Sequence, residues 1–291
     1  MSRGTAAEHR LAWLLCAPAV ITMLLVTAYP MLYSLWLSLF RYDLRFPDQR
    51  EFIGLQNYVA VLGSPTWWES LANTLIVTTA SVALELLLGF VFALMMHRAL
   101  IGRRAIRTSL LVPYGIITVV AAMSWRFAFD PTTGFINGLL GLEGALLAER
   151  WTAFGVIILA EIWKTTPFMA LLLLGGLTLV PENLLRAARV DGAGALQRFF
   201  HITLPLMRQV IVVALLFRTL DAFRIFDSVF VLTRGAQGTE PVSLVGYNTL
   251  ITRLNLGLGS AVSVLIFCCV VVIALIYIKG FGIELSRQEE K

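Results

Sequence analysis

The stretch RAARVDGAGALQRFFHITLP, residues 186–205, separates two long apolar runs and differs from both. Its arginines, Asp191 and paired glycines make it too polar to cross a bilayer. Leu196, Phe199 and Ile202 are nevertheless too apolar for a solvated loop. A short helix with exposed apolar residues beside a membrane normally binds the membrane surface or a partner protein. The stretch therefore predicts a docking element outside the bilayer.

The composition places the chain among integral membrane proteins. Hydrophobic residues make up 58% of its 291 residues, charged residues only 14%, and the mean hydropathy is +0.81. The net charge of +5 comes without a basic run of the kind that binds nucleic acid, so we expect no nucleic-acid partner. The three cysteines all lie within apolar runs, so neither a disulfide framework nor a metal site is expected.

Six apolar runs are long enough to cross a membrane. A transmembrane helix needs about 20 mainly apolar residues to span a hydrocarbon core of roughly 30 Å. We therefore predict an all-α membrane protein that forms a single domain over residues 1–291. The expected spans lie near residues 11–35, 71–97, 106–129, 152–175, 208–232 and 257–279.

The distribution of basic residues predicts the orientation of the chain. With the N-terminus inside, the inner segments contain thirteen of the 23 lysine and arginine residues and the outer loops contain six. Cytoplasmic loops keep such a positive excess. We therefore expect a multi-pass protein of the plasma membrane with both termini and residues 186–205 in the cytoplasm.

Eight charged residues fall inside the predicted spans. Each costs about 2.5–3.5 kcal/mol at the centre of an inserted helix, so they cannot all face lipid. One interpretation is pairing, because Glu161 and Lys164 are three residues apart and the charges from Arg218 to Asp227 alternate in sign at the same spacing. The other interpretation is a polar path. The eight residues are Glu85, Arg126, Glu161, Lys164, Arg218, Asp221, Arg224 and Asp227.

Aromatic residues stand beside several of these charges. A sugar ring presents apolar C–H faces together with hydroxyl edges, so neighbouring aromatic and ionic side chains suit a sugar path. The alternative is that each aromatic ring fills helix packing or contacts lipid. Under the first interpretation the candidate path residues are Trp125, Arg126, Glu161, Trp163, Lys164, Asp221, Phe223, Arg224 and Asp227.

Neither catalysis nor nucleotide binding has a motif in the sequence. The histidines are scattered singly, and no metalloprotease helix motif or serine nucleophile elbow is present. A phosphate-binding loop needs a lysine directly after a glycine, and none of the three lysines has that context. We therefore expect a chain that is not an enzyme and binds no cofactor. If it transports actively, another chain hydrolyses ATP.

The opening stretch resembles the coupling loop of ABC importer permeases. That pattern is E-A-A, three residues, G, nine residues, then I-x-L-P. Ala187, Ala188, Gly192 and the final I-x-L-P residues occupy the required positions, whereas Arg186 stands where the family usually has glutamate. The resemblance implies a cytoplasmic coupling helix between spans 4 and 5, within residues 181–205. It also implies that an ATPase docks on Arg186, Ala187, Ala188, Asp191, Gly192, Ile202, Leu204 and Pro205.

Gly192 itself has two possible uses. A glycine permits a backbone conformation that side chains resist, and it also lets a partner approach closely. Either use explains a glycine that follows Asp191 between two short helices, and Ala187 and Ala188 one turn earlier would keep such an approach open.

Three further segments are similar to the sugar-transport branch of the same family, the maltose and trehalose type. They are FIGLQNY at 52–58, residues 161–193, and FRTLDAFRIFDSVFVLTRG at 217–235. The resemblance implies a type I importer permease fold in a heterodimer with a second, homologous permease. It further implies two ATPase subunits that bind ATP and Mg, an extracytoplasmic sugar-binding lipoprotein, and a disaccharide substrate, with trehalose expected first.

Two other function classes are compatible with parts of the sequence. A secondary carrier for a polar solute would need a titratable residue in its path, and Glu85 or Asp221 has that chemistry. A membrane-embedded glycosyltransferase would need clustered acids in a loop, for which Asp43 and Asp48 are the available pair. Uptake without nucleotide by this chain alone would favour the carrier.

Overall fold

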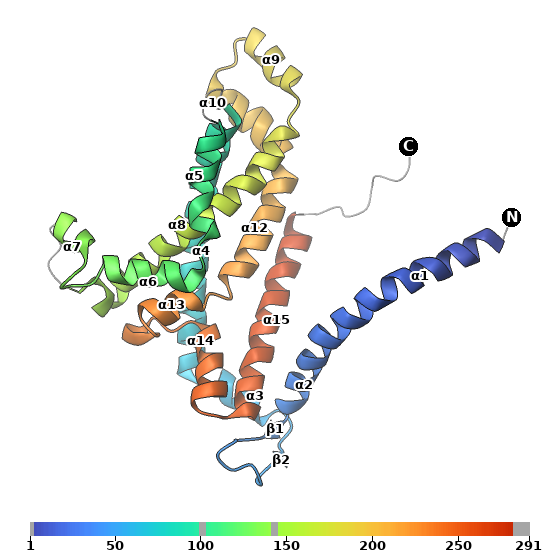
Figure 1. Cartoon of the computed structure of the whole chain (residues 1–291), viewed down its shortest axis with the longest axis vertical. Helices are drawn as coiled ribbons and strands as arrows, with labels where there is room; N and C mark the ends of the chain where they lie inside the picture. Colours follow the sequence, from blue (N-terminus) through green and yellow to red (C-terminus); the bar gives the residue numbers. More distant parts are fainter. Residues whose placement is uncertain (1–2, 99–102, 141–144, 282–291) are drawn as a thin grey trace. The chain divides into compact units, whose positions relative to one another are not determined.

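The computed structural model describes residues 3–98, 103–140 and 145–281. The contacts divide the chain into two compact units. Unit 1 comprises Met1–Pro65 and Val245–Phe267, and unit 2 comprises Thr66–Leu244 and Cys268–Lys291. Both units are mainly helical (Figure 1). The expectation of a single domain remains a prediction.

Unit 1 joins a long apolar helix to a small hairpin. The helix comprises α1 (Arg3–Met23), a π-helical turn (Leu24–Ala28) and α2 (Tyr29–Leu37). Strands β1 (Phe40–Arg41) and β2 (Glu51–Phe52) are antiparallel, with Phe40 opposite Phe52. Asn57 of α3 (Gln56–Leu62) donates from Nδ2 to the carbonyl oxygens of Ser38 and Phe40, at 2.7 and 2.9 Å. A second π-helical turn (Asn248–Thr252) precedes α15 (Leu256–Phe281). The hairpin is thus tied to the helix by buried hydrogen bonds.

Gly257 marks the closest backbone approach in unit 1. Its amide donates to the Tyr42 carbonyl at 3.0 Å, and a Cβ at this position would lie 2.0 Å from the Phe40 carbonyl oxygen. Because that atom belongs to the backbone, Gly257→Ala should cost about 1–3 kcal/mol of stability. Thermal unfolding in detergent measures this loss. Gly155→Ala is the matched control, because no atom lies within 4 Å of its Cβ position. Equal melting temperatures for the two variants would contradict the prediction.

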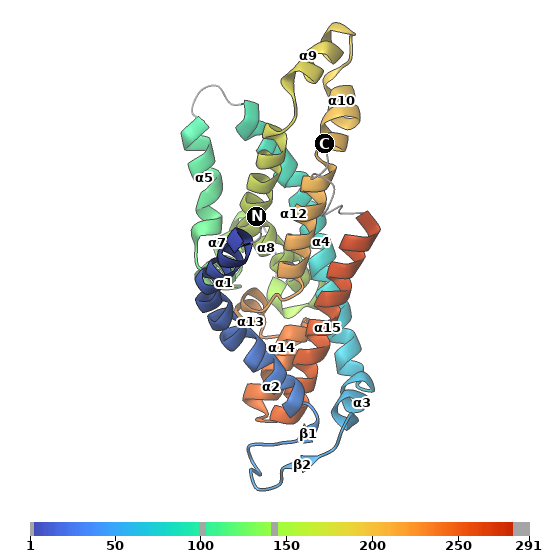
Figure 2. The same ribbon diagram turned by 90° about the vertical axis from the view of Figure 1, so that its right-hand side faces the viewer.

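Unit 2 is a helical bundle with short helices at its ends. Its long helices are α4 (Pro65–Arg98), α8 (Arg150–Thr178) and α12 (Arg208–Ala222), and α8 contacts both α12 and α5 (Arg103–Gly115) (Figures 1 and 2). The last turns of α15 also belong to this unit. The remaining elements are α6 (Thr118–Ala128), α7 (Phe135–Leu140), a 3-10 turn (Leu146–Ala148), α9 (Glu182–Val190), α10 (Ala195–Arg198), a π-helical turn (Phe199–Thr203), α11 (Leu204–Leu206), α13 (Asp227–Leu232) and a second 3-10 turn (Ala236–Gly238). Helix α14 (Val242–Tyr247) begins in unit 2, and its residues from Val245 on belong to unit 1.

The apolar core of unit 2 forms where α4, α8 and α12 meet. Phe90 and Met96 of α4 pack with Met169 and Leu173 of α8, and Met207 closes the cluster. Gly89 allows this approach, since a Cβ there would lie 2.8 Å from the Met169 side chain. Close packing of large side chains keeps these three helices in register. The short helices α9 and α10, which contain the predicted docking element, are attached to this core.

Among the described residues, four helical stretches are long and apolar enough to cross a membrane, and the number is six if each of two bent helix pairs forms one span. The fold class is therefore confirmed, but two predicted spans are not continuous. The span 106–129 breaks after Gly115, where α5 and α6 meet at 96°. Pro113 and Gly115 weaken the helix there, and Ile117 is extended with ψ 134°. The span 208–232 stops at Ala222 and resumes at Asp227.

Candidate functional site

Helix α9 lies at one end of unit 2 and has two different faces (Figure 1). It follows the extended Pro181, whose ring fixes the backbone just before the first turn. Glu182, Leu185, Arg186 and Arg189 recur at helical spacing and line a cavity. Leu184, Ala187 and Ala188 fall on the opposite face of the same helix, where 48% of the Leu184 surface is exposed. This second face offers small and apolar side chains to a partner.

The end of α9 explains Gly192. The Ala193 amide donates to the Ala188 carbonyl at 2.8 Å and the Gly192 amide donates to the Arg189 carbonyl at 3.2 Å. These two bonds form a Schellman motif, which requires a left-handed residue at the position of Gly192. Its φ is +85°, and apart from its chain neighbours no described residue has an atom within 4 Å of the position its Cβ would take. The backbone use of this glycine is therefore present in the structure.

An aromatic and apolar anchor ties the stretch after α9 to the core of unit 2. Phe199 meets Phe90 of α4 edge to face, with ring centroids 5.6 Å apart. Leu204 packs against the same core, and Met207 is 1% exposed. In contrast, 75% of Leu196 and 56% of Phe200 remain exposed. The stretch is thus held on one side and open on the other, as a docking element needs.

The proposed coupling residues occupy different positions on this element. Ala187, Asp191 and Gly192 are exposed, Ala188, Ile202 and Leu204 are partly buried, and Pro205 is exposed at the start of α11. Arg186 lies on the cavity face and pairs with Glu182 one turn earlier. Both partners are largely exposed, so this pair contributes little to stability. The docking role of these residues remains a prediction.

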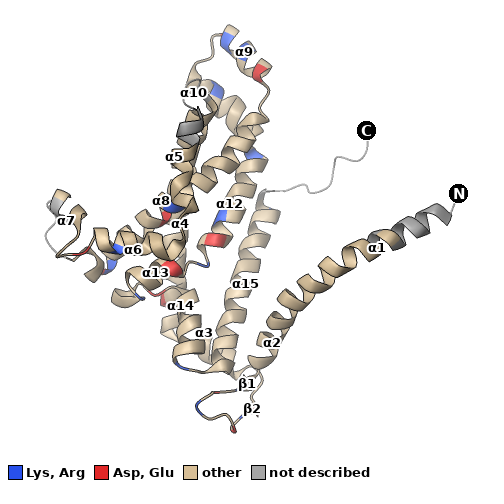
Figure 3. Cartoon of the chain, viewed as in Figure 1, with Lys and Arg blue, Asp and Glu red and all other residues tan. Residues whose placement is uncertain are grey.

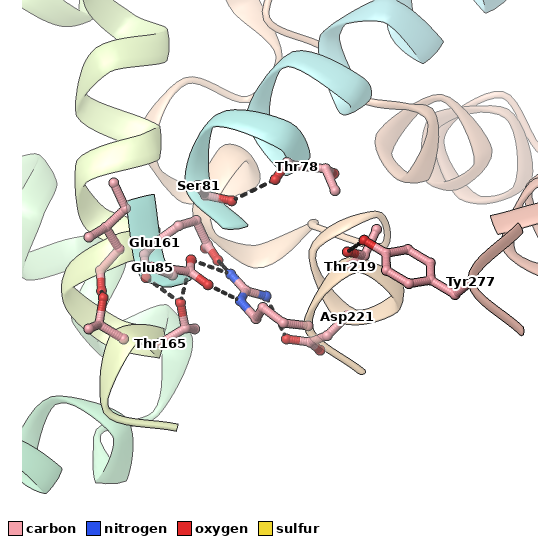
Figure 4. A network of polar contacts seen from close by, with 11 residues as sticks. Thr78, Ser81, Glu85, Glu161, Thr165, Thr219, Asp221 and Tyr277 are labelled. Atoms are coloured by element: carbon pink, nitrogen blue, oxygen red, sulfur yellow. Dashed lines mark hydrogen bonds and ion pairs between the residues drawn. The ribbon is translucent and has the colours of Figure 1, made fainter. Parts of the chain in front are cut away.

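A buried ionic cluster lies in the middle of unit 2 (Figure 4). Arg218 of α12 is 1% exposed and donates to three carboxylates. Its Nε and Nη2 reach Glu85 of α4 at 2.5 and 2.9 Å, Nη2 reaches Glu161 of α8 at 3.2 Å, and Nη1 reaches Asp221 at 2.8 Å. The bidentate bond to Glu85 is the geometry in which guanidinium and carboxylate interact most strongly.

Hydroxyl groups complete the hydrogen bonds of the two buried carboxylates. Thr165 donates to Glu85 Oε1 at 2.7 Å, and Ser228 of α13 donates to Glu161 Oε1. Buried charges are tolerated when they are paired and hydrogen-bonded in this way. The cluster therefore joins α4, α8, α12 and α13 through side chains that come from distant parts of the sequence.

A polar cavity of about 480 Å³ borders this cluster. Asp221 contributes to it with 68% of its side chain exposed, and the Arg224 side chain makes no hydrogen bond or ion pair with any described residue. Acidic, basic, hydroxyl and aromatic side chains thus line the same cavity. The lining residues are Tyr114, Thr118, Glu161, Lys164, Thr165, Arg218, Asp221, Arg224, Ile225, Phe226, Asp227 and Ser228.

Five of the nine candidate path residues line this cavity, and four do not. The five are Glu161, Lys164, Asp221, Arg224 and Asp227. Phe223 is buried, with 1% of its surface exposed. Trp125 and Trp163 contact each other edge to face, with their ring centroids 5.9 Å apart. Arg126 donates to the Val231 carbonyl at 3.1 Å. The latter four residues therefore have packing or capping contacts in the structure.

Three of the four expected charge pairs do not form among the described residues. Among the described residues no ion pair joins Glu161 to Lys164; Lys164 instead donates to the Ile116 carbonyl at 2.8 Å. That carbonyl lies at the break between α5 and α6, where it has lost its helical partner. The alternating series also fails beyond Asp221, because Arg224 falls in the break between α12 and α13. Only the pair Arg218–Asp221 forms as expected.

Several cavity residues lay outside the sequence-based candidate list. Tyr114, Thr118, Thr165 and Ser228 are common residue types with no motif around them, so no sequence signal distinguished them. Phe226 follows the helix break and lines the cavity in place of the expected Phe223. The sequence identified Glu85 and Arg218 as charged residues within predicted spans. Their contact with each other could not be predicted from the sequence.

Asp43, one of the two loop acids considered for glycosyltransfer, is held by a neighbouring arginine. The Arg45 side chain and amide hydrogen-bond to Asp43, which lowers the pKa of Asp43 to about 2. Such a carboxylate is a poor general base at neutral pH. Among residues 3–98, 103–140 and 145–281, no group of three metal-binding side chains was found.

Sequence comparison assigns most of the chain to one family. Residues 85–280 match the family described as binding-protein-dependent transport system inner membrane component. The chain is 55% identical to the trehalose transport system permease protein SugA of Mycobacterium tuberculosis, over 95% of this chain and 90% of that protein. It is 38% identical to the trehalose/maltose transport system permease protein MalF of Thermococcus litoralis, over 94% of each chain.

Solved structures support the same fold. A bacterial ABC transporter involved in the import of the acidic polysaccharide alginate has a chain that superposes with a TM-score of 0.82 at 22% identity, covering 98% of this chain and 100% of that chain. The same kind of transporter in complex with an alginate pentasaccharide-bound periplasmic protein gives a TM-score of 0.80 at 21% identity, over 94% of each chain. The relatives are named as transport permeases, which favours a transport subunit over the glycosyltransferase and the secondary carrier.

Proposed function

The chain belongs to the binding-protein-dependent transport system inner membrane components, and on that premise we propose that it forms half of a path for a disaccharide, with trehalose as the first candidate. It is a multi-pass, non-catalytic permease subunit of an ABC importer. The second half of the path belongs to a homologous permease. The names of the two relatives described above support trehalose over other disaccharides.

The polar cavity in unit 2 is the observation on which this proposal rests. Its volume of about 480 Å³ falls within the range of small-molecule sites, which is roughly 300–1,000 Å³. Sugar hydroxyls both donate and accept hydrogen bonds, so a lining with Asp221, Asp227, Lys164 and Arg224 provides partners of both kinds. Tyr114 and Phe226 add ring faces for the C–H surface of a sugar.

The coupling element supports an external source of energy. We assign ATPase docking to residues 181–205, with the face formed by Leu184, Ala187 and Ala188 against the partner. Two ATPase subunits bind ATP and Mg, and an extracytoplasmic lipoprotein delivers the sugar. In this arrangement residues 1–291 form one permease domain in the plasma membrane. Helix α9 and both chain termini lie on the cytoplasmic side of that membrane.

Two exposed cavity charges should be needed for uptake. Asp221→Asn and Arg224→Gln each remove an ionic partner for a sugar hydroxyl, and a hydrogen bond to a charged group contributes about 1.5–3 kcal/mol. We expect the apparent affinity for trehalose in uptake assays to fall by about tenfold or more, at unchanged protein level. Radiolabelled trehalose uptake in cells that produce each variant measures this.

Arg126→Gln is the matched control for these variants. Arg126 is an exposed arginine of unit 2 that contacts the Val231 carbonyl and does not line the cavity. Its replacement should leave the affinity for trehalose within about twofold, because an exposed polar contact contributes little. If Asp221→Asn and Arg224→Gln transport trehalose like Arg126→Gln, the cavity is not the sugar path.

A further inference from the structure

A second cavity, of about 350 Å³, lies in unit 2 beside α9 and has a basic lining. Arg186, Arg189 and Arg198 line it, with Glu182 as the acid of the set. Three guanidinium groups and one carboxylate leave an excess of positive charge. Leu94 and Leu177 are among the apolar residues of the wall. The cavity therefore combines a basic rim with an apolar surface.

The arginines reach this cavity because of the spacing on α9. Glu182, Arg186 and Arg189 lie at positions i, i+4 and i+7, which share one face of a helix. Arg198 comes from α10, so the two short helices contribute from either side. Figure 3 shows basic residues gathered over α9 and α10 at this end of unit 2. The face of α9 assigned to ATPase docking, formed by Leu184, Ala187 and Ala188, lies on the opposite side of the helix, although Arg186 of the predicted docking set lines the cavity.

The three guanidinium groups differ in how far their hydrogen bonds are used. Arg186 pairs with Glu182, and Arg198 donates from Nη1 to the Ala193 carbonyl. The Arg189 side chain makes no hydrogen bond or ion pair with any residue that the structure describes. Each guanidinium has five N–H donors, so most of these donors have no partner among residues 3–98, 103–140 and 145–281. The excess of donors matches an anion with several acceptor oxygens.

We propose that this cavity binds a phosphate group, held by Arg189 and Arg198. A guanidinium offers two parallel N–H groups that match phosphate oxygens, and two arginines from different helices can hold one phosphate between them. Basic pockets between helices at the membrane boundary bind phospholipid head groups, and the apolar wall suits the glycerol and acyl part of a lipid. The phosphate comes either from such a lipid or from a soluble phosphate ion.

The test measures binding to the full chain purified in a neutral detergent. Three ligands are titrated separately, namely phosphatidylglycerol and phosphatidylcholine in mixed micelles and inorganic phosphate in buffer, with ligand-induced thermal stabilisation as the readout. Arg189→Gln is the main variant, because the Arg189 side chain is exposed and has no hydrogen-bond or ionic partner among the described residues. Arg208→Gln is the control, because it removes the same charge from an exposed residue of α12 outside the cavity.

We expect phosphatidylglycerol or inorganic phosphate to stabilise the protein against thermal unfolding. Arg189→Gln should weaken the binding of that anion about tenfold, whereas Arg208→Gln should change it by less than about twofold. Stabilisation by phosphatidylglycerol alone identifies a lipid head group, and stabilisation by inorganic phosphate identifies a soluble ion. Either result supports the site. The proposal is overturned if neither anion stabilises the protein, if phosphatidylcholine does so equally, or if Arg208→Gln weakens binding as much as Arg189→Gln. Sugar uptake does not enter this test, so its outcome is independent of the proposed transport function.

Discussion

Arg218→Met should destabilise the folded chain by about 3–5 kcal/mol, because it leaves two buried carboxylates without their counter-charge. Methionine keeps most of the volume of the arginine stem, so the loss reports the guanidinium rather than a cavity. Glu85 is fully buried and Glu161 is 7% exposed, so neither carboxylate can recover its hydration without rearranging the bundle. Thermal unfolding in detergent and the yield of membrane-inserted protein measure the effect.

The matched control for this prediction is Asp221→Asn. Asp221 also pairs with Arg218, at 2.8 Å, but 68% of its side chain is exposed. Exposed pairs contribute about 0–1 kcal/mol, so this variant should unfold close to the wild type while its sugar uptake falls. Glu85→Gln combined with Arg218→Met should recover part of the stability lost by Arg218→Met alone, since one unpaired charge is removed. Equal stability of Arg218→Met and Asp221→Asn would show that the buried cluster does not hold the bundle together.

Gly192→Leu should abolish most sugar uptake without preventing insertion into the membrane. The φ of Gly192 is +85°, and a side chain in the left-handed region costs roughly 1–2 kcal/mol. That strain acts on the Schellman motif at the end of α9, where the Ala193 and Gly192 amides hold the last carbonyls. Since Phe199 connects this element to Phe90 of α4, a displaced α9 transmits ATPase movement poorly. The measurements are ATPase co-purification and the ratio of sugar imported to ATP hydrolysed.

Two companion variants separate backbone strain from loss of a docking surface. Asparagine tolerates the left-handed conformation better than leucine does. Gly192→Asn should therefore retain more coupling between ATP hydrolysis and sugar import than Gly192→Leu. Ala187→Leu adds bulk to the exposed face of α9 at a helical position, without φ strain, and should weaken ATPase attachment. If Gly192→Leu imports sugar with normal coupling at normal abundance, Gly192 has no role in docking. If Ala187→Leu leaves attachment unchanged, the docking face lies elsewhere on the element.

The membrane fold could be predicted largely from the sequence because each span must satisfy its own backbone hydrogen bonds. Length and apolar content locate such helices, as for residues 152–175 within α8. The interruptions escaped prediction because the runs at 106–129 and 208–232 are long and apolar enough overall to read as continuous spans, although Pro113, Arg224 and Asp227 lie within them. Their freed carbonyls are satisfied from elsewhere, by Lys164 for Ile116 and by Ser243 for Ile225. These partners are distant in sequence and follow from the tertiary fold.

The candidate site was predictable to a similar, limited extent. Local spacing indicated the pair Arg218–Asp221 and the left-handed glycine after α9, because both depend on neighbours along one helix. The bond from Arg218 to Glu85 joins residues 133 positions apart, and no periodicity within one helix points to it. Glu161 was therefore assigned to Lys164, its neighbour in sequence, whereas in the structure it contacts Arg218. Which charges share a cavity depends on the packing of α4, α8 and α12.

The measurement that tests the central claim most directly is ATP hydrolysis coupled to sugar uptake in proteoliposomes. The full transporter is assembled from this chain, its partner permease, the ATPase subunits and the sugar receptor, and is compared with vesicles that contain this chain alone. We expect trehalose, more than maltose, to stimulate ATP hydrolysis and to accumulate only when ATP and all subunits are present. Accumulation of trehalose by this chain alone, without nucleotide, would contradict the account.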